Sequence, residues 1–242
     1  MSRLGIIGGS GLARLATLDI EHQEAFSTPY GEPSAPLTFG QLAGRPVVFL
    51  PRHGAGHTLP PHRVNYRANV WALREAGAER VIGMAAVGGI TQPPGTICVP
   101  DQLVDYTWGR EHTYFDADLT QVTHVDFTEP YCAGLRDALL AAGARLGMAV
   151  VDGGTYAAAQ GPRLESAAEI RRMESDGCDL VGMTGMPEAG LARELALCYA
   201  CCAVVVNWAA GKSDGPITME EIEANLETGM ERARQLLGAL EW

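Results

Sequence analysis

Strand-like and helix-like segments alternate along the whole chain, and this alternation is the sequence feature that most restricts the fold. Short apolar runs rich in β-branched residues are typical of buried strands. The expected strands lie at 4–7, 46–50, 80–84, 96–104, 150–159, 179–183 and 201–206, and the expected helices at 63–76, 130–146, 165–175, 187–197 and from 218 onward. Strands that alternate with helices predict an α/β protein with a parallel or mixed sheet.

The 242 residues contain no linker, composition shift or internal repeat. We therefore expect one domain, residues 1–242, with a central mixed sheet flanked by helices. The C-terminal helix has the clearest signal. Thr218 and Glu221 match the capping-box pattern, and apolar residues then recur at helical spacing.

Composition and charge exclude several classes of partner. A net charge of -11 argues against a nucleic-acid surface, which needs clustered Lys and Arg. No apolar run approaches the roughly 20 residues of a membrane helix. The first apolar run is short and broken by glycines, unlike the core of a signal peptide. We expect a cytoplasmic protein with neither a nucleic-acid nor a membrane partner.

The cysteines and histidines give weak signals for chemistry. Cys198 and Cys201 form a C-x-x-C pair, but no second pair completes a zinc site, and both lie in or beside an apolar run. We expect all six cysteines to be buried thiols. The histidines at 53, 57 and 62 lack the pairing of a metal motif such as H-E-x-x-H, so no metal site is expected.

Small or polar residues stand at or just beyond the ends of the expected strands. They are Ser10, Arg52, His53, Ala85, Ala86, Glu165, Met183, Thr184 and Asn207. In an open α/β sheet such ends converge on one crevice. A guanidinium beside an imidazole suits phosphate, and a carboxylate with an amide suits a heterocycle. The alternatives are an ordinary tight turn at 8–11 and a surface salt bridge at Arg52.

Longer motifs carry a resemblance. They are GIIGGSGL, PRHGAGHTLPPHRVNYRANVWAL, AAVGGI, YFDADL, HVDFTEPYC, GTYAAAQGPRLES and GMTGMPEAGLARELALCYA. With these motifs the chain resembles the trimeric purine nucleoside phosphorylase and 5′-methylthioadenosine phosphorylase family over nearly its full length. The resemblance implies a homotrimer in which inorganic phosphate attacks the anomeric carbon of a nucleoside and releases the purine. Phosphate is then a co-substrate, and no cofactor or metal is implied.

The resemblance also assigns roles by motif. Phosphate would be bound by Ser10, Arg52, His53 and Thr184, with help from the backbone of Ala85 and Ala86. Met183 would lie against the ribose, and Leu164 would belong to the substrate pocket. The closest members of the family have a hydroxyl residue where Ala85 stands, so this chain lacks one phosphate contact. The residues expected to act in catalysis are His53, Glu165 and Asn207.

Two positions bear on the choice of base. The methylthioadenosine branch has aspartates at the positions of Asn207 and Ala209, whereas 6-oxopurine enzymes have an Asn at the first position and a Glu where Glu165 stands. The chemistry agrees, because Asn207 can donate to O6 or N7 of hypoxanthine and Glu165 can accept from its N1–H. Adenine would instead present a lone pair to Glu165, and each mispaired buried group costs about 1–3 kcal/mol. The alternative is that Glu165 caps the following helix and that Asn207 holds its own turn.

The 5′ end of the sugar is expected to meet an apolar wall. By resemblance, Met219 and Ile222 would line it together with His124 of the partner subunit. An apolar wall favours a methylthio group over a free hydroxyl, unless Met219 and Ile222 only anchor their helix. The expected reaction is therefore phosphorolysis of S-methyl-5′-thioinosine. Its alternatives are a 5′-methylthioadenosine phosphorylase, an inosine or guanosine phosphorylase, a nucleosidase that uses water, and a purine-binding protein without activity.

Overall fold

Eleven strands form one mixed sheet in the computed structural model, which describes residues 3–12, 17–117 and 119–242. The strands are β1 (Arg3–Gly8), β2 (Asp19–Glu24), β3 (Leu37–Leu42), β4 (Arg45–Pro51), β5 (Ala78–Gly89), β6 (Ile97–Val99), β7 (Gln102–Asp105), β8 (Val151–Asp152), β9 (Thr155–Ala158), β10 (Leu180–Gly182) and β11 (Cys198–Trp208). Strands β4, β1, β5 and β11 are parallel, whereas β10 runs antiparallel to β5. The expected central mixed sheet is confirmed.

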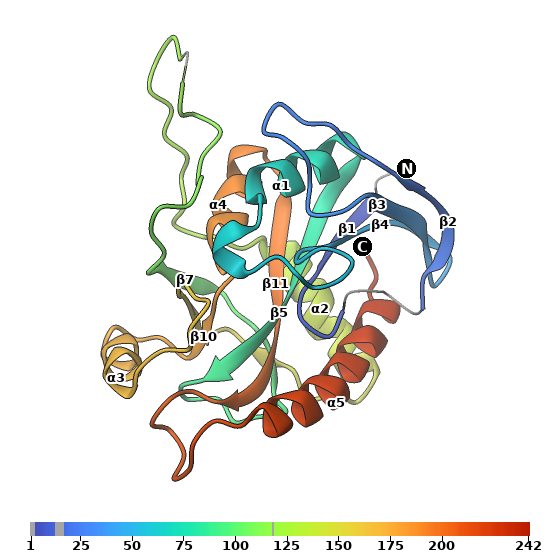
Figure 1. The fold of residues 1–242 in the computed structure, drawn as a ribbon. Helices are drawn as coiled ribbons and strands as arrows, with labels where there is room; N and C mark the ends of the chain where they lie inside the picture. Colours follow the sequence, from blue (N-terminus) through green and yellow to red (C-terminus); the bar gives the residue numbers. More distant parts are fainter. Residues whose placement is uncertain (1–2, 13–16, 118) are drawn as a thin grey trace.

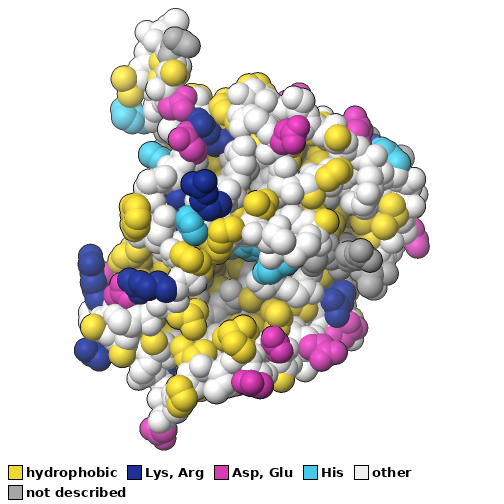
Figure 2. Space-filling model, viewed as in Figure 1, with side chains coloured by type: hydrophobic (Ala, Val, Ile, Leu, Met, Phe, Trp, Pro, Cys, Tyr) yellow, Lys and Arg dark blue, Asp and Glu magenta, His cyan; other side chains and the backbone are white. Residues whose placement is uncertain are grey.

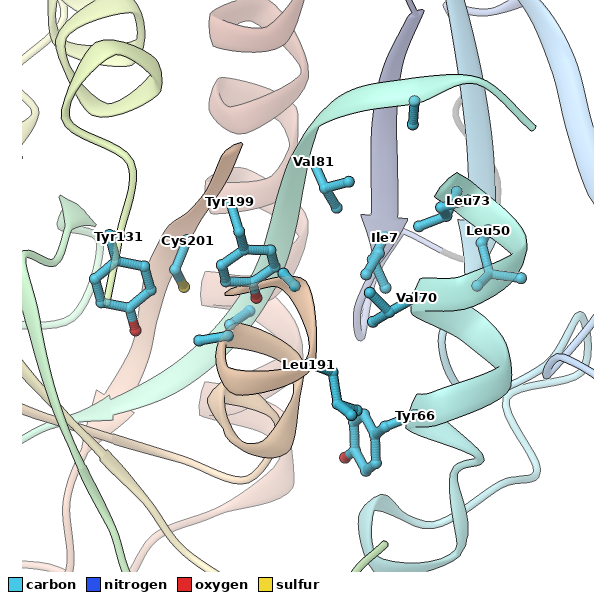
Figure 3. Packing of buried hydrophobic residues seen from close by; sticks show 14 of the residues in the cluster. Ile7, Leu50, Tyr66, Val70, Leu73, Val81, Tyr131, Leu191, Tyr199 and Cys201 are labelled. Carbon is cyan, nitrogen blue, oxygen red and sulfur yellow. The ribbon is translucent and has the colours of Figure 1, made fainter. Parts of the chain in front are cut away.

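Helices cover both faces of the sheet (Figure 1). They are α1 (Tyr66–Glu75), α2 (Ala133–Arg145), α3 (Ala167–Ser175), α4 (Gly185–Glu194) and α5 (Met219–Gly238), with a short 3-10 turn η1 (Pro61–Arg63) before α1. Buried side chains of α1 and α4 share one core cluster, and those of α2 and α5 share another. Figure 3 shows Val70 and Leu73 of α1 beside Ile7 and Leu50 of the sheet.

The apolar run in β11 is explained by burial on both faces. Its side chains alternate between the two clusters: Tyr199, Cys201, Ala203 and Val205 belong to the first, and Ala200, Cys202, Val204 and Val206 to the second. A central strand that is covered by helices on both sides needs apolar residues at every position. The strand is therefore packed on both faces as far as Val206, and the next residue, Asn207, places its polar side chain at the cavity.

Several boundaries differ from the sequence expectation. The expected strands 96–104 and 150–159 are each split in two, as β6 with β7 and β8 with β9. The helix expected from residue 165 begins at Ala167, because Ser166 is its N-cap and forms a full capping box with Glu169. At α5, Thr218 accepts a hydrogen bond from the backbone N–H of Glu221, as expected.

Two of the six cysteines are not thiols, so this part of the cysteine prediction is wrong. Cys132, just before α2, forms a disulfide with Cys198, the first residue of β11, and their Cα atoms lie 5.1 Å apart. The other four cysteines are free and buried, as expected (Cys98, Cys178, Cys201 and Cys202). The C-x-x-C spacing of Cys198 and Cys201 therefore has no part in the pairing.

The described residues include neither a membrane-spanning helix nor a metal-binding cluster. None of the described helices is both long enough and apolar enough to span a membrane. Within residues 3–12, 17–117 and 119–242, no group of three or more His, Cys, Asp or Glu side chains is placed to hold a metal ion.

Candidate active site

A cavity of about 500 Å³ opens at the ends of β1, β4, β10 and β11 and beside the C-terminal half of β5. Ala85 and Ala86 lie within β5, which continues to Gly89, so the strand end expected at residue 84 is wrong. With one exception, every site residue expected from the sequence lines it: Ser10, Arg52, His53, Ala85, Ala86, Leu164, Glu165, Met183, Thr184, Asn207, Ala209, Met219 and Ile222. The exception is His124. The convergence arises because β1, β4, β5 and β11 are parallel, which places their carboxyl ends along one edge.

Arg52 lies under one end of the cavity and is only 1% exposed. Its Nε and Nη2 donate to the two carboxylate oxygens of Glu188 in α4, with Nη2 2.8 Å from Oε2. Its Nη1 donates to the Met84 carbonyl at 2.8 Å. Arg52 is therefore part of a buried ion pair, and the interpretation as a surface salt bridge is wrong.

Glu188 is the functional residue that the sequence reasoning missed. It is fully buried, and its Oε2 also accepts a hydrogen bond from the Tyr199 hydroxyl at 2.9 Å. Burial alone would lower the pKa of Arg52, but the charge and hydrogen bonds of Glu188 outweigh burial and raise it. Three of the five guanidinium N–H groups meet acceptors among the described residues, so two remain available for a ligand.

His53 is held as a neutral imidazole. Its Nδ1 lies 2.8 Å from the Leu59 carbonyl, which can only accept, so Nδ1 carries the proton and Nε2 keeps a lone pair. Burial, the charge of Arg52 and the neighbouring His57 lower the pKa of His53 to about 4. A neutral Nε2 can accept a hydrogen bond from a partly protonated phosphate or from a sugar hydroxyl.

The turn after β1 approaches Arg52 closely. A Cβ atom on Gly9 would lie 2.5 Å from the Met84 carbonyl oxygen and 3.0 Å from Nη1 of Arg52, so only glycine fits there. The next residue, Ser10, places its Oγ 3.5 Å from Nε2 of His57. His57 also lines the cavity but was not expected to belong to the site. These contacts gather two imidazoles, one guanidinium and one hydroxyl at the same end.

The other end of the cavity contains Glu165 and Asn207. Ser166 rather than Glu165 caps α3, so the capping alternative for Glu165 is wrong. Burial raises the pKa of the Glu165 carboxyl above its usual range. Asn207 is 6% exposed, and its Nδ2 donates to the Trp208 carbonyl at 2.7 Å. The turn-holding role of Asn207 therefore exists, but its second N–H and its Oδ1 are not used by that bond.

The side walls are apolar. Ala209 is buried beside Asn207, and Met219, Ile222 and Leu226 of α5 line the cavity. Met219 is 61% exposed, so it is not a buried anchor for α5, whereas Ile222 packs against the core cluster beneath that helix. The anchoring alternative therefore applies to Ile222 and fails for Met219.

His124 is not among the described residues that line the cavity. It lies between β7 and α2 on residues 106–132, which we call the excursion, and it is exposed. The excursion leaves the body of the molecule as a long loop and forms the projecting lobe of the space-filling view (Figures 1 and 2). Large apolar side chains are exposed on it, including Trp108 at 72% and Val122 at 74%.

Comparison with known proteins decides the family. A family model described as the phosphorylase superfamily matches residues 3–240. The chain belongs to the phosphorylase superfamily. A probable S-methyl-5′-thioinosine phosphorylase of Pseudomonas syringae pv. tomato is 57% identical over 239 residues, covering 98% of this chain and 97% of that protein. A 6-oxopurine nucleoside phosphorylase of Pyrococcus furiosus is 46% identical over 229 residues, covering 92% and 85%.

Solved structures of the superfamily share the fold. The methylthioadenosine phosphorylase of Schistosoma mansoni, in complex with adenine, superposes with a TM-score of 0.94 at 32% identity and covers 99% of this chain and 90% of that chain. The family and the fold expected from the sequence motifs are thus confirmed.

Proposed function

We propose that the protein is a pentosyltransferase that converts S-methyl-5′-thioinosine and phosphate into hypoxanthine and 5-methylthioribose 1-phosphate, a purine-salvage reaction. The observation that carries this proposal is the set of residues that line one cavity. It has a cationic end at Arg52, an amide and a carboxylate at Asn207 and Glu165, and a methyl group at Ala209. Relatives that are 57% and 52% identical carry the name probable S-methyl-5′-thioinosine phosphorylase.

At the cationic end, phosphate would meet the two N–H groups of Arg52 that Glu188 and Met84 leave unused. Ser10, Thr184 and the backbone at Ala85 and Ala86 would complete the phosphate site. An arginine fixed by a carboxylate presents its remaining donors in one orientation, which suits a tetrahedral anion. Neutral His53 would accept a hydrogen bond at Nε2 from the hydroxyl of a monoprotonated phosphate, so that an unprotonated oxygen faces the sugar.

The reaction needs no covalent enzyme intermediate. A phosphate oxygen forms a bond to the anomeric carbon while the bond from that carbon to the purine nitrogen breaks, and the electron pair of that bond leaves with the base. The monoprotonated phosphate loses its proton as the ester forms and the departing base takes up one proton, so the reaction consumes no net proton. The transition state resembles an oxocarbenium ion, and the bound phosphate stabilises its positive charge. Holding both reactants in one cavity supplies the rest of the rate increase through proximity. Catalysis therefore requires phosphate as co-substrate and no cofactor.

The departing base would be read by Asn207 and Glu165. The free N–H of Asn207 would donate to N7 or O6, where negative charge develops as the base leaves. Glu165 would accept from N1–H of a 6-oxopurine. Ala209 offers no acceptor for a 6-amino group. An adenine base would leave buried polar groups mispaired, and sites of this kind discriminate strongly.

At the 5′ end, the apolar side chains of Met219, Ile222 and Leu226 would surround a methylthio group. We also propose that the working enzyme is a cytoplasmic homotrimer of one domain per chain, in which His124 of the partner subunit closes this pocket. The exposed apolar side chains of the excursion support that assembly, because residues such as Val122 would be covered by a neighbouring copy.

The test is an assay of base release. Purified protein is incubated with methylthioinosine, methylthioadenosine, inosine and adenosine, each with and without phosphate, and free base is measured. We expect fastest release from methylthioinosine, and only with phosphate. Faster release from methylthioadenosine would overturn the base assignment, and release without phosphate would indicate a nucleosidase.

A second candidate is an inosine or guanosine phosphorylase, and the Pyrococcus furiosus relative favours it. The two candidates share the base end and differ only at the 5′ pocket. Equal kcat/KM for inosine and methylthioinosine in the same assay would support this second function.

A further inference from the structure

Arg110 is a buried arginine whose contacts connect two separate walls of the cavity. It is 8% exposed and lies near the start of the excursion, outside the cavity lining. One edge of its guanidinium donates to the 159–160 segment, from Nη2 to the carbonyls of Ala159 and Gln160 at 3.2 and 2.8 Å and from Nε to the Gln160 side chain at 3.2 Å. The other edge donates from Nη1 to the carbonyls of Met183 and Met186 at 2.8 and 2.6 Å.

The two segments bear the residues that face the substrate. Residue 160 comes directly before the loop that carries Leu164 and Glu165 at the base end. The carbonyls at 183 and 186 enclose Thr184, which belongs to the phosphate end, and Met183 itself lines the cavity. These segments are more than 20 residues apart in sequence. They continue β9 and β10, which pair in parallel, and the last bond between them runs from the Ala159 N–H to the Gly182 carbonyl at 2.7 Å. Arg110 bridges the two segments just beyond that bond, where both leave the sheet.

The electrostatic setting of Arg110 is unusual. Among the described residues, no carboxylate lies within ion-pair distance of its guanidinium. The charge is instead surrounded by backbone carbonyl groups and by the Tyr66 ring, whose centroid lies 5.4 Å from Cζ. A buried arginine is rare, and one that only stabilised the core would be expected to have an acidic partner, as Arg52 has. Bonds to main-chain carbonyls instead fix the path of the backbone at both segments.

We propose that Arg110 is a positioning residue that sets the distance between the base-reading loop and the Met183 wall. This inference rests on the proposed function for the identity of the substrate, although the geometry itself does not depend on it. Arginine suits the task because its five N–H donors form a planar fork, whereas the three donors of lysine radiate from one atom and cannot reach both segments at once. The residue acts on substrate only through Glu165 and Met183.

The experiment compares Arg110→Lys with a matched control, Arg136→Lys. Arg136 also donates to two main-chain carbonyls, those of Val99 and Pro100, and it pairs with Asp152. None of the three residues that it contacts lines the cavity. For Arg110→Lys we expect a rise of about tenfold or more in KM for the nucleoside, and a smaller rise in KM for phosphate because Thr184 lies between the two carbonyls that Arg110 holds. The kcat/KM ratio of methylthioinosine to methylthioadenosine is expected to fall, because Glu165 is no longer held. Arg136→Lys is expected to leave both KM values and the ratio unchanged.

Two further measurements keep the inference testable if Arg110→Lys folds poorly or if the substrate proves to be different. Gln160→Ala removes one acceptor of Arg110 and is expected to shift the same KM in the same direction by a smaller factor. Amide hydrogen exchange of free Arg110→Lys is expected to speed up at 159–165 and 183–186 together. Unchanged exchange at either segment, or an effect limited to melting temperature as in Arg136→Lys, would overturn the inference. A wild-type chain inactive on methylthioinosine would overturn the proposed function alone.

Discussion

Arg52 and His53 are neighbours in sequence and respond to burial in opposite ways. Glu188 compensates the buried charge of Arg52, so that residue stays cationic. His53 has no carboxylate in hydrogen-bond contact among the described residues and donates to a backbone carbonyl, so it stays neutral. The pair therefore provides one fixed positive charge and one neutral hydrogen-bond acceptor side by side.

The first prediction concerns stability against pH. The pKa of His53 is about 4 in the folded chain and about 6.5 when the imidazole is solvated. As the pH falls, His53 of the unfolded chain is protonated before His53 of the folded chain. The stability that the protein gains from keeping His53 neutral is therefore fully present above about pH 6.5 and is lost by pH 4. In urea unfolding at several pH values, His53→Gln is expected to lose less stability over this interval than wild type.

The control is His22→Gln, because His22 is about half exposed and far from Arg52 in sequence. It is expected to follow the wild-type curve. If His53→Gln follows that curve as well, His53 is not the group that titrates in this interval.

The second prediction at this scale concerns the base. Asn207→Asp combined with Ala209→Asp would supply the two carboxylates found in the methylthioadenosine branch. Each repaired or mispaired group is worth about 1–3 kcal/mol, so the kcat/KM ratio of methylthioadenosine to methylthioinosine is expected to rise at least tenfold. Ala209→Asn with wild-type Asn207 is the uncharged control and is expected to shift the ratio less. An unchanged ratio in the double variant would contradict the base-end model.

At the scale of elements, the sequence could predict the strands of the sheet centre, but it placed the end of β5 at residue 84, whereas that strand continues to Gly89. It could not predict β2, because all six residues of that strand are exposed and show no apolar pattern. It also merged β6 with β7, because the turn at Pro100 and Asp101 lies within a single apolar stretch. Strand ends in a parallel sheet share an edge, and for this reason Ser10, Arg52, His53 and Asn207 could be placed in one cavity in advance. The family resemblance added Met219 and Ile222, but neither signal indicated the segment that carries His57.

The residues that were missed act between elements. Glu188 meets Arg52 across 136 positions, and Arg110 meets Met183 across 73. The spacing of residues within one helix or strand does not indicate such contacts between distant elements. An acidic residue inside the otherwise small and apolar start of α4 was the one local sign of Glu188.

The third prediction tests that helix-to-strand pair. Glu188→Gln is expected to lower the free energy of unfolding by about 3–5 kcal/mol, because Arg52 would be left as a buried charge without its partner. It is also expected to raise KM for phosphate, since Arg52 loses its fixed orientation. Urea unfolding and phosphate-dependent rates measure the two effects.

Glu174→Gln provides the comparison for Glu188→Gln. Glu174 pairs with Lys212 at 2.8 Å but is 42% exposed, so its loss is expected to cost less than about 1 kcal/mol. A Glu188→Gln variant as stable as Glu174→Gln would show that the buried pair has little effect on folding.

At the scale of the whole molecule, the disulfide is the feature that sequence could not reveal. Six cysteines permit 15 complete pairings, and in the fold Cys132 and Cys198 meet across 66 positions. The chain between them includes Glu165, Met183 and Thr184 of the cavity lining and Glu188, the partner of Arg52. The start of β11 is held there twice, because Cys132 also donates its backbone N–H to the Tyr199 carbonyl at 2.8 Å.

The fourth prediction follows from that loop. Closing about 66 residues restricts the unfolded chain, and the loop-entropy relation assigns such a cross-link about 4 kcal/mol. For a chain of this size, 1 kcal/mol corresponds to roughly 2–4 °C in Tm. Reduction of the wild-type protein is therefore expected to lower Tm by about 10 °C, and the Cys132→Ser, Cys198→Ser double variant is expected to show the lower Tm with or without reductant.

Because the four other cysteines are buried, they are not expected to react with a thiol reagent in the folded state. A wild-type Tm that does not respond to reductant would show that the cross-link is absent in solution or that it does not stabilise the fold.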